Sequence, residues 1–154
     1  MVDNFSYKFS DNHYFHVFSD GTKLKWLFKD DEDFISGINR IGICSFVSKV
    51  QIYSYVLMDN HLHILIYGSD SKCEEFINKY KLLTGKWIRN KYGKSDYPGP
   101  FYISAIKLET ADHVYNVLAY IDRNVINTNY PYLISEYPWG SAKYFFKERV
   151  ISEG

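Results

Sequence analysis

Hydrophobic positions along the chain predict four strands. Each is rich in β-branched or aromatic residues and is bounded by turn-forming residues. The predicted strands cover residues 13–18, 50–58, 61–67 and 101–108. The pair Asp20-Gly21 closes the first strand, and Asp59-Asn60 separates the second from the third.

Apolar residues at helical spacing predict three helices between these strands. Four acids at Asp30 to Asp33 suit the start of the first helix, which continues through Phe34, Ile38 and Ile41. The second covers residues 71–92, and Thr110 caps a third that runs to about Asn124. The order β-α-β-β-α-β-α predicts an α+β fold with a ferredoxin-like antiparallel sheet covered by helices.

Length and composition place the chain among globular proteins. Its 154 residues suit one domain over 1–154, with 46% hydrophobic and 23% charged residues and an unusual 19% aromatic residues. No apolar run approaches the length of a membrane span, and the first ten residues lack a signal-peptide pattern. Cys44 and Cys73 are too few for a disulfide framework. We expect a cytoplasmic protein with no membrane partner.

The net charge of zero hides an uneven distribution. Residues 1–35 carry seven acids against four lysines, whereas residues 72–107 carry eight bases against three acids. A neutral chain argues against a nonspecific nucleic-acid binder, but the second segment predicts a basic face. The alternative is that this segment is an ordinary solvated helix surface.

The sharpest local feature is His61-Leu62-His63 on the third predicted strand. Residues two apart on a strand point to the same face, about 7 Å apart, so two imidazoles can converge on one divalent ion. The alternative is a pair of satisfied histidines in a buried strand. Two histidines are too few for a closed zinc site, so a third ligand must come from another element.

The helix that begins at Thr110 offers such a ligand. Tyr120 and Asn124 lie four residues apart and therefore share a helix face, beside the apolar stripe. An amide oxygen suits Mg²⁺ or Mn²⁺, and a tyrosine beside the ion could attack a polarised phosphate. The alternative is that Tyr120, one of 15 tyrosines, is a packing residue.

Several motifs in order resemble the single-tyrosine HUH transposases, the IS200-like superfamily, and best match its REP-associated tyrosine transposase branch. Residues 56–66 resemble the Met-Pro-Asn-His-x-His strand, with Asp59 in place of Pro, and residues 120–124 match Tyr-Ile-x-x-Asn. Residues 137–144 are similar to the downstream Tyr-Pro-Trp-Ser-Ser segment, and His16-Val17 occupies the place of a His-Val pair. Together the motifs span roughly residues 14–146.

The resemblance implies a metal-dependent enzyme that cleaves and rejoins single-stranded DNA at hairpin-bearing ends. His61, His63 and Asn124 would hold Mg²⁺ or Mn²⁺ against the scissile phosphate. Tyr120 would attack, which leaves a 5′-phosphotyrosine and a free 3′-OH. His113, on the same helix face, would assist proton transfer or be a surface histidine.

The basic segment is expected to contact DNA phosphates while aromatic residues stack on unpaired bases. The candidate DNA-binding residues are Lys79, Lys86, Arg89 and Lys91. Many relatives dimerise, so a homodimer is a further expectation. Because the chain ends soon after Tyr144, we expect no appended DNA-binding domain.

The chain departs from the family pattern where basic residues are usual. Ser19-Asp20 takes the place of an arginine, residues 100–106 lack the Phe-Gln-x-Arg pattern, and Val125 replaces a proline. Two alternatives therefore stand beside the transposase: a hairpin-binding module that no longer cuts, and a metal-dependent phosphoesterase in which water replaces tyrosine. A covalent protein–DNA adduct separates the transposase from both.

Overall fold

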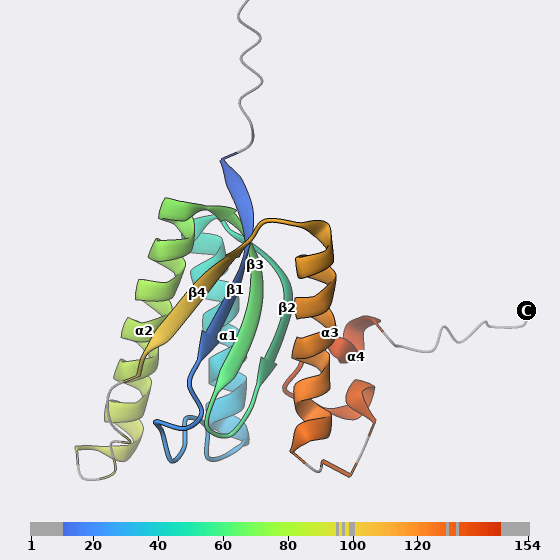
Figure 1. Cartoon of the computed structure of the whole chain (residues 1–154). Coiled ribbons are helices and arrows are strands. Elements are labelled where there is room, and N and C mark those ends of the chain that lie inside the picture. Colours follow the sequence, from blue (N-terminus) through green and yellow to red (C-terminus); the bar gives the residue numbers. More distant parts are fainter. Residues whose placement is uncertain are drawn as a thin grey trace, which may run out of the picture.

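A computed structural model describes residues 11–94, 96, 98, 101–128, 130–131 and 133–145. The elements are β1 Asn12–Ser19, α1 Asp31–Ser48, β2 Gln51–Leu57, β3 Leu62–Ser69, α2 Asp70–Tyr92, β4 Ile103–Leu108, α3 Ala111–Asn127, a 3-10 turn at Ile134–Glu136 and α4 Ala142–Phe145 (Figure 1). The seven predicted elements are confirmed in type and order. The last two short elements were not predicted, and Pro100 of the departing 100–106 segment lies outside the described residues.

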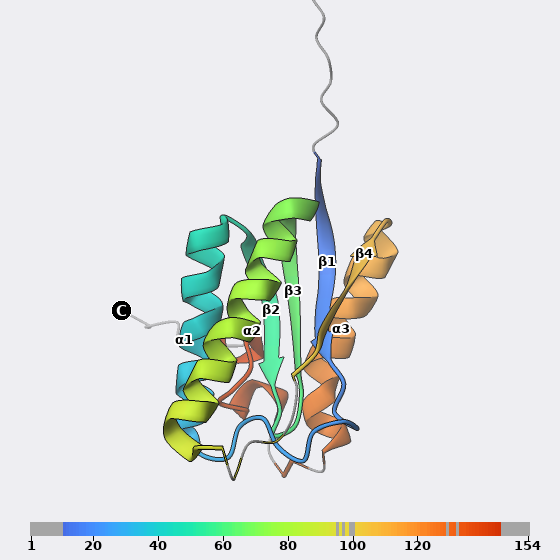
Figure 2. The ribbon, with the colours of Figure 1, turned by 90° about the vertical axis from the view of Figure 1, so that its left-hand side faces the viewer.

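The four strands form one antiparallel sheet in the order β2-β3-β1-β4. Helices α1 and α2 cover one face, and α3 lies on the other (Figures 1 and 2). This arrangement confirms the predicted α+β, ferredoxin-like class. The register places Phe18 of β1 opposite His63 of β3, which brings the first strand beside the His-x-His motif.

Side-chain caps fix the starts of the three long helices. Asp30, Ser69 and Thr110 each accept a hydrogen bond from the backbone N–H three residues later, which satisfies one of the free donors of the first turn. At its other end, α2 stops at Gly93, whose φ of 72° lies in a region that glycine enters without strain. The capping residues therefore set the element boundaries.

Alternation along β3 divides the buried residues between two cores. Leu62, Ile64 and Ile66 join the core beneath α1 and α2, whereas Leu65 packs in a second core beneath α3. By the same alternation, His63 faces α3. A slip of one residue in the pairing would send the histidine into the wrong layer, so the apolar residues of β3 also fix the orientation of the site.

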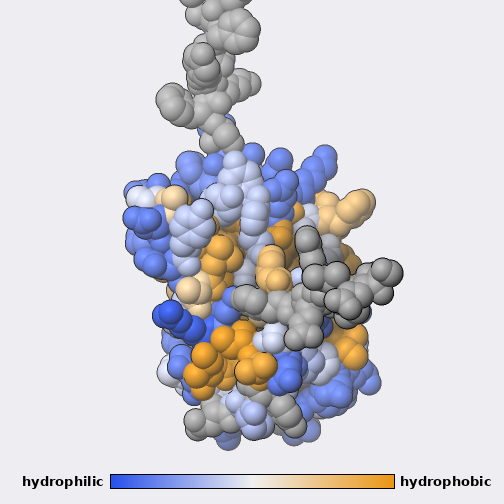
Figure 3. Space-filling model, turned by 90° about the vertical axis from the view of Figure 1, so that its right-hand side faces the viewer, coloured by the Kyte–Doolittle hydropathy of each residue, from blue (hydrophilic) through white to orange (hydrophobic). Residues whose placement is uncertain are grey.

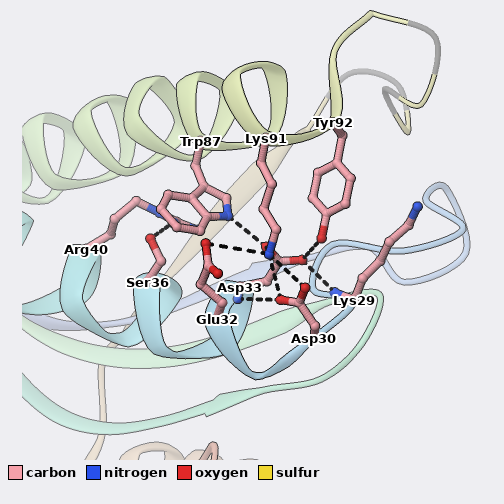
Figure 4. A network of polar contacts seen from close by, with 9 residues as sticks. All are labelled: Lys29, Asp30, Glu32, Asp33, Ser36, Arg40, Trp87, Lys91 and Tyr92. Atoms are coloured by element: carbon pink, nitrogen blue, oxygen red, sulfur yellow. Dashed lines mark hydrogen bonds and ion pairs between the residues drawn. The ribbon is translucent and has the colours of Figure 1, made fainter.

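A polar network ties the start of α1 to the end of α2 (Figure 4). The buried carboxylate of Asp33 accepts hydrogen bonds from Trp87 Nε1 at 2.8 Å, Lys29 N at 2.9 Å and the Tyr92 hydroxyl. Lys91 Nζ lies 3.1 Å from Asp33 and 2.7 Å from Asp30. Burial alone would raise the pKa of Asp33, but these donors hold it below its usual value. Lys91 of the basic 72–107 segment is thus paired with two acids of the 1–35 segment.

The Tyr-Pro-Trp segment covers the outer edge of β2. The Tyr137 hydroxyl donates to Leu57 O at 2.5 Å, and Leu57 N donates to Trp139 O at 2.8 Å. Ser141 N donates to Tyr55 O at 2.9 Å. These bonds occupy backbone groups that an edge strand otherwise leaves free. The motif that marked the family in the sequence therefore stabilises the sheet.

The solvent side of α3 mixes hydrophobic and hydrophilic side chains (Figure 3). Ile126 on α3 and Leu133 just beyond it are 59% and 68% exposed.

In the described part of the chain, none of the helices combines the length and the apolar character needed to cross a membrane.

Candidate functional site

A cavity of about 580 Å³ opens between α3, the start of β3 and the loop after β1. It is lined by Phe18, Ser19, Asp20, Gly21, Thr22, Lys23, Asn60, His61, His63, Tyr102, Ser104 and Tyr120. The His-x-His motif and the candidate nucleophile Tyr120 therefore share one cavity. The motif and the tyrosine meet because α3 packs against β3, on the face of the sheet toward which His63 points.

The ring of His61 has a fixed orientation because Asn60 holds it. Asn60 Nδ2 donates to Gly21 O at 2.9 Å, which leaves Asn60 Oδ1 as an acceptor. That oxygen lies 2.7 Å from His61 Nδ1. His61 therefore carries its proton on Nδ1, and its Nε2 keeps a free lone pair.

Asn124 presents a second lone pair to that nitrogen. Its Nδ2 donates to Tyr120 O at 2.9 Å, so its Oδ1 is turned outward. Oδ1 lies 3.5 Å from His61 Nε2, at the limit of hydrogen bonding, and in the Nδ1–H tautomer of His61 neither atom carries a proton. Two lone pairs that face each other across this gap fit a divalent cation.

His63 is buried, at 6% exposure, and lies in the same cavity. Its Nδ1 lies 3.0 Å from Nε2 of His16 on β1. Burial lowers the pKa of His63 to about 3, and the neighbouring His16 and His61 add to the effect. The imidazole is therefore neutral at neutral pH, which is the form that binds a metal.

Tyr120 lies over the two histidines of the sheet with an accessible side chain. It is 48% exposed, and its ring centroid lies 5.2 Å from that of His63 and 6.0 Å from that of His16. Tyr120 stands one helical turn before Asn124 on α3. The structure thus brings together all four residues predicted as catalytic or metal-binding.

The four predicted DNA-binding residues lie elsewhere. Lys79, Lys86, Arg89 and Lys91 belong to α2, on the opposite face of the sheet from α3 (Figure 2). Lys86 and Arg89 are exposed, whereas Lys91 is held by the acids of α1. Contact between these residues and DNA stays a prediction.

The position of His113 fits a surface histidine better than a residue that assists proton transfer. His113 is exposed at the start of α3 and is not among the cavity-lining residues. Among the described residues, no group of three or more His, Cys, Asp and Glu side chains could hold a metal ion. The structure brings two imidazoles and one amide together, and metal binding by them stays a prediction.

Sequence reasoning missed four residues in or beside the cavity. His16 entered only as part of a family motif and Asn60 only as part of a turn. Tyr102 and Lys23 also line the cavity, and the lysine Nζ lies 5.8 Å from the Tyr102 ring centroid. The alternation of β1 could have placed His16 on one face with Phe18, but the partner strand was not visible in the sequence.

Comparison with known proteins identifies the family. The family described as "Transposase IS200 like" matches residues 9–124. The structure of a REP-associated tyrosine transposase bound to a REP hairpin has the same fold, with a TM-score of 0.58 and 12% identity over 86% of this chain and 77% of that one. A protein of Deinococcus radiodurans R1 assigned as a transposase has a TM-score of 0.50 and 14% identity over 75% and 90%. No curated protein matches the sequence significantly. The predicted resemblance is confirmed, and the chain belongs to the IS200-like transposase family.

Proposed function

We propose that this transposase cleaves and rejoins single-stranded DNA at hairpin-bearing ends through a covalent 5′-phosphotyrosine on Tyr120. His61, His63 and Asn124 hold a divalent cation beside the scissile phosphate. The observation that carries the proposal is the pair of facing lone pairs on His61 Nε2 and Asn124 Oδ1, 3.5 Å apart. His61 lines the cavity together with the exposed Tyr120, and Asn124 lies on the helix that carries that tyrosine.

The roles of the residues follow from their positions. A bound Mg²⁺ or Mn²⁺ supplies Lewis-acid polarisation of the phosphate. Tyr120 Oη attacks phosphorus and forms the P–O bond, while the bond from phosphorus to the 3′-oxygen breaks. The phenol loses its proton, and the departing 3′-oxygen gains one. A 3′-OH can later attack the phosphotyrosine and release Tyr120, which restores the phosphodiester.

The aromatic residues of the cavity suit an unpaired strand. Tyr102 is 59% exposed and Phe18 is half-buried, and both line the cavity beside Lys23. Aromatic faces bind any base by stacking, and a lysine attracts the phosphate between two bases. A hairpin-bound solved structure of the same fold adds support for hairpin DNA as the substrate class.

The test is adduct formation. Protein and a 5′-overhang hairpin oligonucleotide labelled on the 3′ side of the expected cut are incubated with Mn²⁺ and separated under denaturing conditions. We expect a labelled protein band, lost with Tyr120→Phe and retained with Tyr115→Phe. Tyr115 is 68% exposed on the same helix and does not line the cavity, so it is a matched control.

The outcomes separate the candidate functions. A cut strand without an adduct would support the phosphoesterase with a water nucleophile. Hairpin binding without cutting would support the binding module. An adduct that persists in Tyr120→Phe would contradict the assignment of the nucleophile.

A further inference from the structure

His16 contacts His63 through a ring nitrogen on each side. Nε2 of His16 lies 3.0 Å from Nδ1 of His63, and the planes of the two rings are inclined by 23°, with centroids 5.2 Å apart. The contact is diagonal across the β1–β3 pair, because Phe18 is the residue directly opposite His63. The backbone pairing of β1 with β3 therefore fixes the relative positions of the two residues.

This contact contains a single proton. An imidazole binds a metal in its neutral form, which carries one N–H. A separation of 3.0 Å between two ring nitrogens is a hydrogen bond, in which one nitrogen donates and the other accepts. The choice of donor decides whether His63 Nε2 has a lone pair or a proton.

We infer that His16 is a positioning residue that accepts a hydrogen bond from His63 Nδ1–H and so presents His63 Nε2 to the divalent cation. The inference rests on the proposed function, because it concerns the same cation. His63 Nδ1 is turned toward β1, so Nε2 is the ring nitrogen left for the ion. A neutral imidazole binds a metal only through its unprotonated nitrogen, so the proton belongs on Nδ1.

The contacts of His16 fit a positioning role. Its half-buried ring has three aromatic neighbours, Phe18, His63 and Tyr120, with centroids 5.0, 5.2 and 6.0 Å away. No hydrogen bond joins His16 to Tyr120 among the contacts of the described residues. With His16 for His63 and Asn60 for His61, each predicted ligand histidine has its own partner on Nδ1.

Three variants test the inference by Mn²⁺ calorimetry. His16→Phe keeps a flat ring but cannot accept a hydrogen bond, and it should weaken Mn²⁺ binding by about 10- to 100-fold. His16→Gln places an amide oxygen near the position of Nε2 and should restore most of the affinity. His13→Gln is the matched control, because His13 lies on the same strand but points to the opposite face.

A second readout follows the proton itself. In ¹⁵N-edited spectra of the Mg²⁺-saturated wild type, His63 should carry its proton on Nδ1, and His16→Phe should lose that hydrogen-bonded signal. Equal Mn²⁺ affinity of folded His16→Phe and wild type, or a failure of His16→Gln to recover, would overturn the inference while leaving the adduct chemistry intact. A wild type that binds no Mn²⁺ would overturn the proposed function and the inference together.

Discussion

At the scale of single residues, two asparagines determine which atoms face the cavity. An amide carries a donor and an acceptor on one planar group, so a hydrogen bond at one end fixes the orientation of the other. Asn60 is fixed by Gly21 O and Asn124 by Tyr120 O. Each then directs an oxygen at His61, one at Nδ1 and one at Nε2.

Asn60→Ala removes the partner of His61 Nδ1 and should weaken Mn²⁺ binding by about 10- to 100-fold, because the ring loses its fixed tautomer. Asn60→Asp keeps an acceptor for the same proton and should retain binding. Calorimetry on both variants, with circular dichroism to confirm the fold, makes the measurement. Equal losses in the two would place the effect in the loop contact to Gly21 instead.

Spacing rules were sufficient to bring together part of the site. The i, i+2 rule on a strand placed His61 and His63 on one face, and the i, i+4 rule placed Tyr120 beside Asn124. The contribution of His16 was beyond those rules, because it depends on the order and register of strands far apart in sequence. The metal-binding and nucleophilic roles themselves remain predictions.

At the scale of elements, periodicity and capping residues predicted the three long helices and the four strands. The segment Tyr137–Ser141 was different, because its hydrogen bonds run to β2, 80 to 87 residues earlier. The segment shows no hydrophobic periodicity of a helix or strand. Its conformation is therefore set by its contacts with the folded sheet. Its role at the sheet edge could not be read from local sequence.

Gly37 allows α1 to approach the sheet closely. A Cβ at this position would lie 2.6 Å from Cε1 of the buried Phe28 ring and 3.0 Å from Leu57 Cδ1. Gly37→Ala should therefore lower the free energy of unfolding by about 1–2 kcal/mol, despite the better helix propensity of alanine.

The matched control is Gly42→Ala on the exposed side of α1, where a Cβ meets no atom within 4 Å. It should raise the free energy of unfolding by about 0.5–1 kcal/mol. Urea denaturation of both variants makes the comparison. A stabilised Gly37→Ala would mean that α1 can shift away from β2 without loss.

Asp33 should make the α1–α2 contact depend on acid pH. The pKa of Asp33 is lower in the folded protein than in the unfolded chain, so its stabilising contribution is complete above about pH 4 and is lost as pH falls through the folded value. Asp33→Asn should reduce the free energy of unfolding at pH 7 by about 2 kcal/mol. The difference from wild type should shrink at pH 3.

Urea titrations at both pH values measure this difference. Asp31→Asn is the control, since Asp31 lies in the same first turn but is exposed. Its effect should stay within about 0.3–1 kcal/mol, the usual contribution of a charge at a helix end. A pH-independent difference for Asp33→Asn would contradict the assigned ionisation.

At the scale of the whole molecule, the sheet separates two surfaces. The candidate site lies on the α3 side, whereas the exposed basic residues of α2 lie on the other side (Figures 1 and 2). A hairpin with a single-stranded flank is large enough to contact more than one surface. We therefore expect the duplex stem on α2 and the unpaired flank in the cavity.

The combined change Lys86→Glu and Arg89→Glu should weaken hairpin binding and reduce the salt slope by about 2, one unit for each lost phosphate contact. Lys23→Glu, in the cavity wall, should weaken binding of an unpaired oligonucleotide more than of a blunt duplex stem. Fluorescence anisotropy across a salt series measures both. An unchanged slope for the α2 variant would exclude α2 from the DNA contact.

The placement of Tyr120 and Asn124 on one turn of α3 constrains the DNA after a cut. In the proposed reaction, the 5′ end of the broken strand becomes attached to the helix that also carries a ligand of the cation. Ile121 and Val125, which alternate with these two residues, anchor the same turn in the core. The covalently attached 5′ end therefore stays beside the cation site. Any motion of α3 moves the attached DNA end and Asn124 together. Resealing then requires only that a new 3′-OH arrive, because the other half of the junction is already in place.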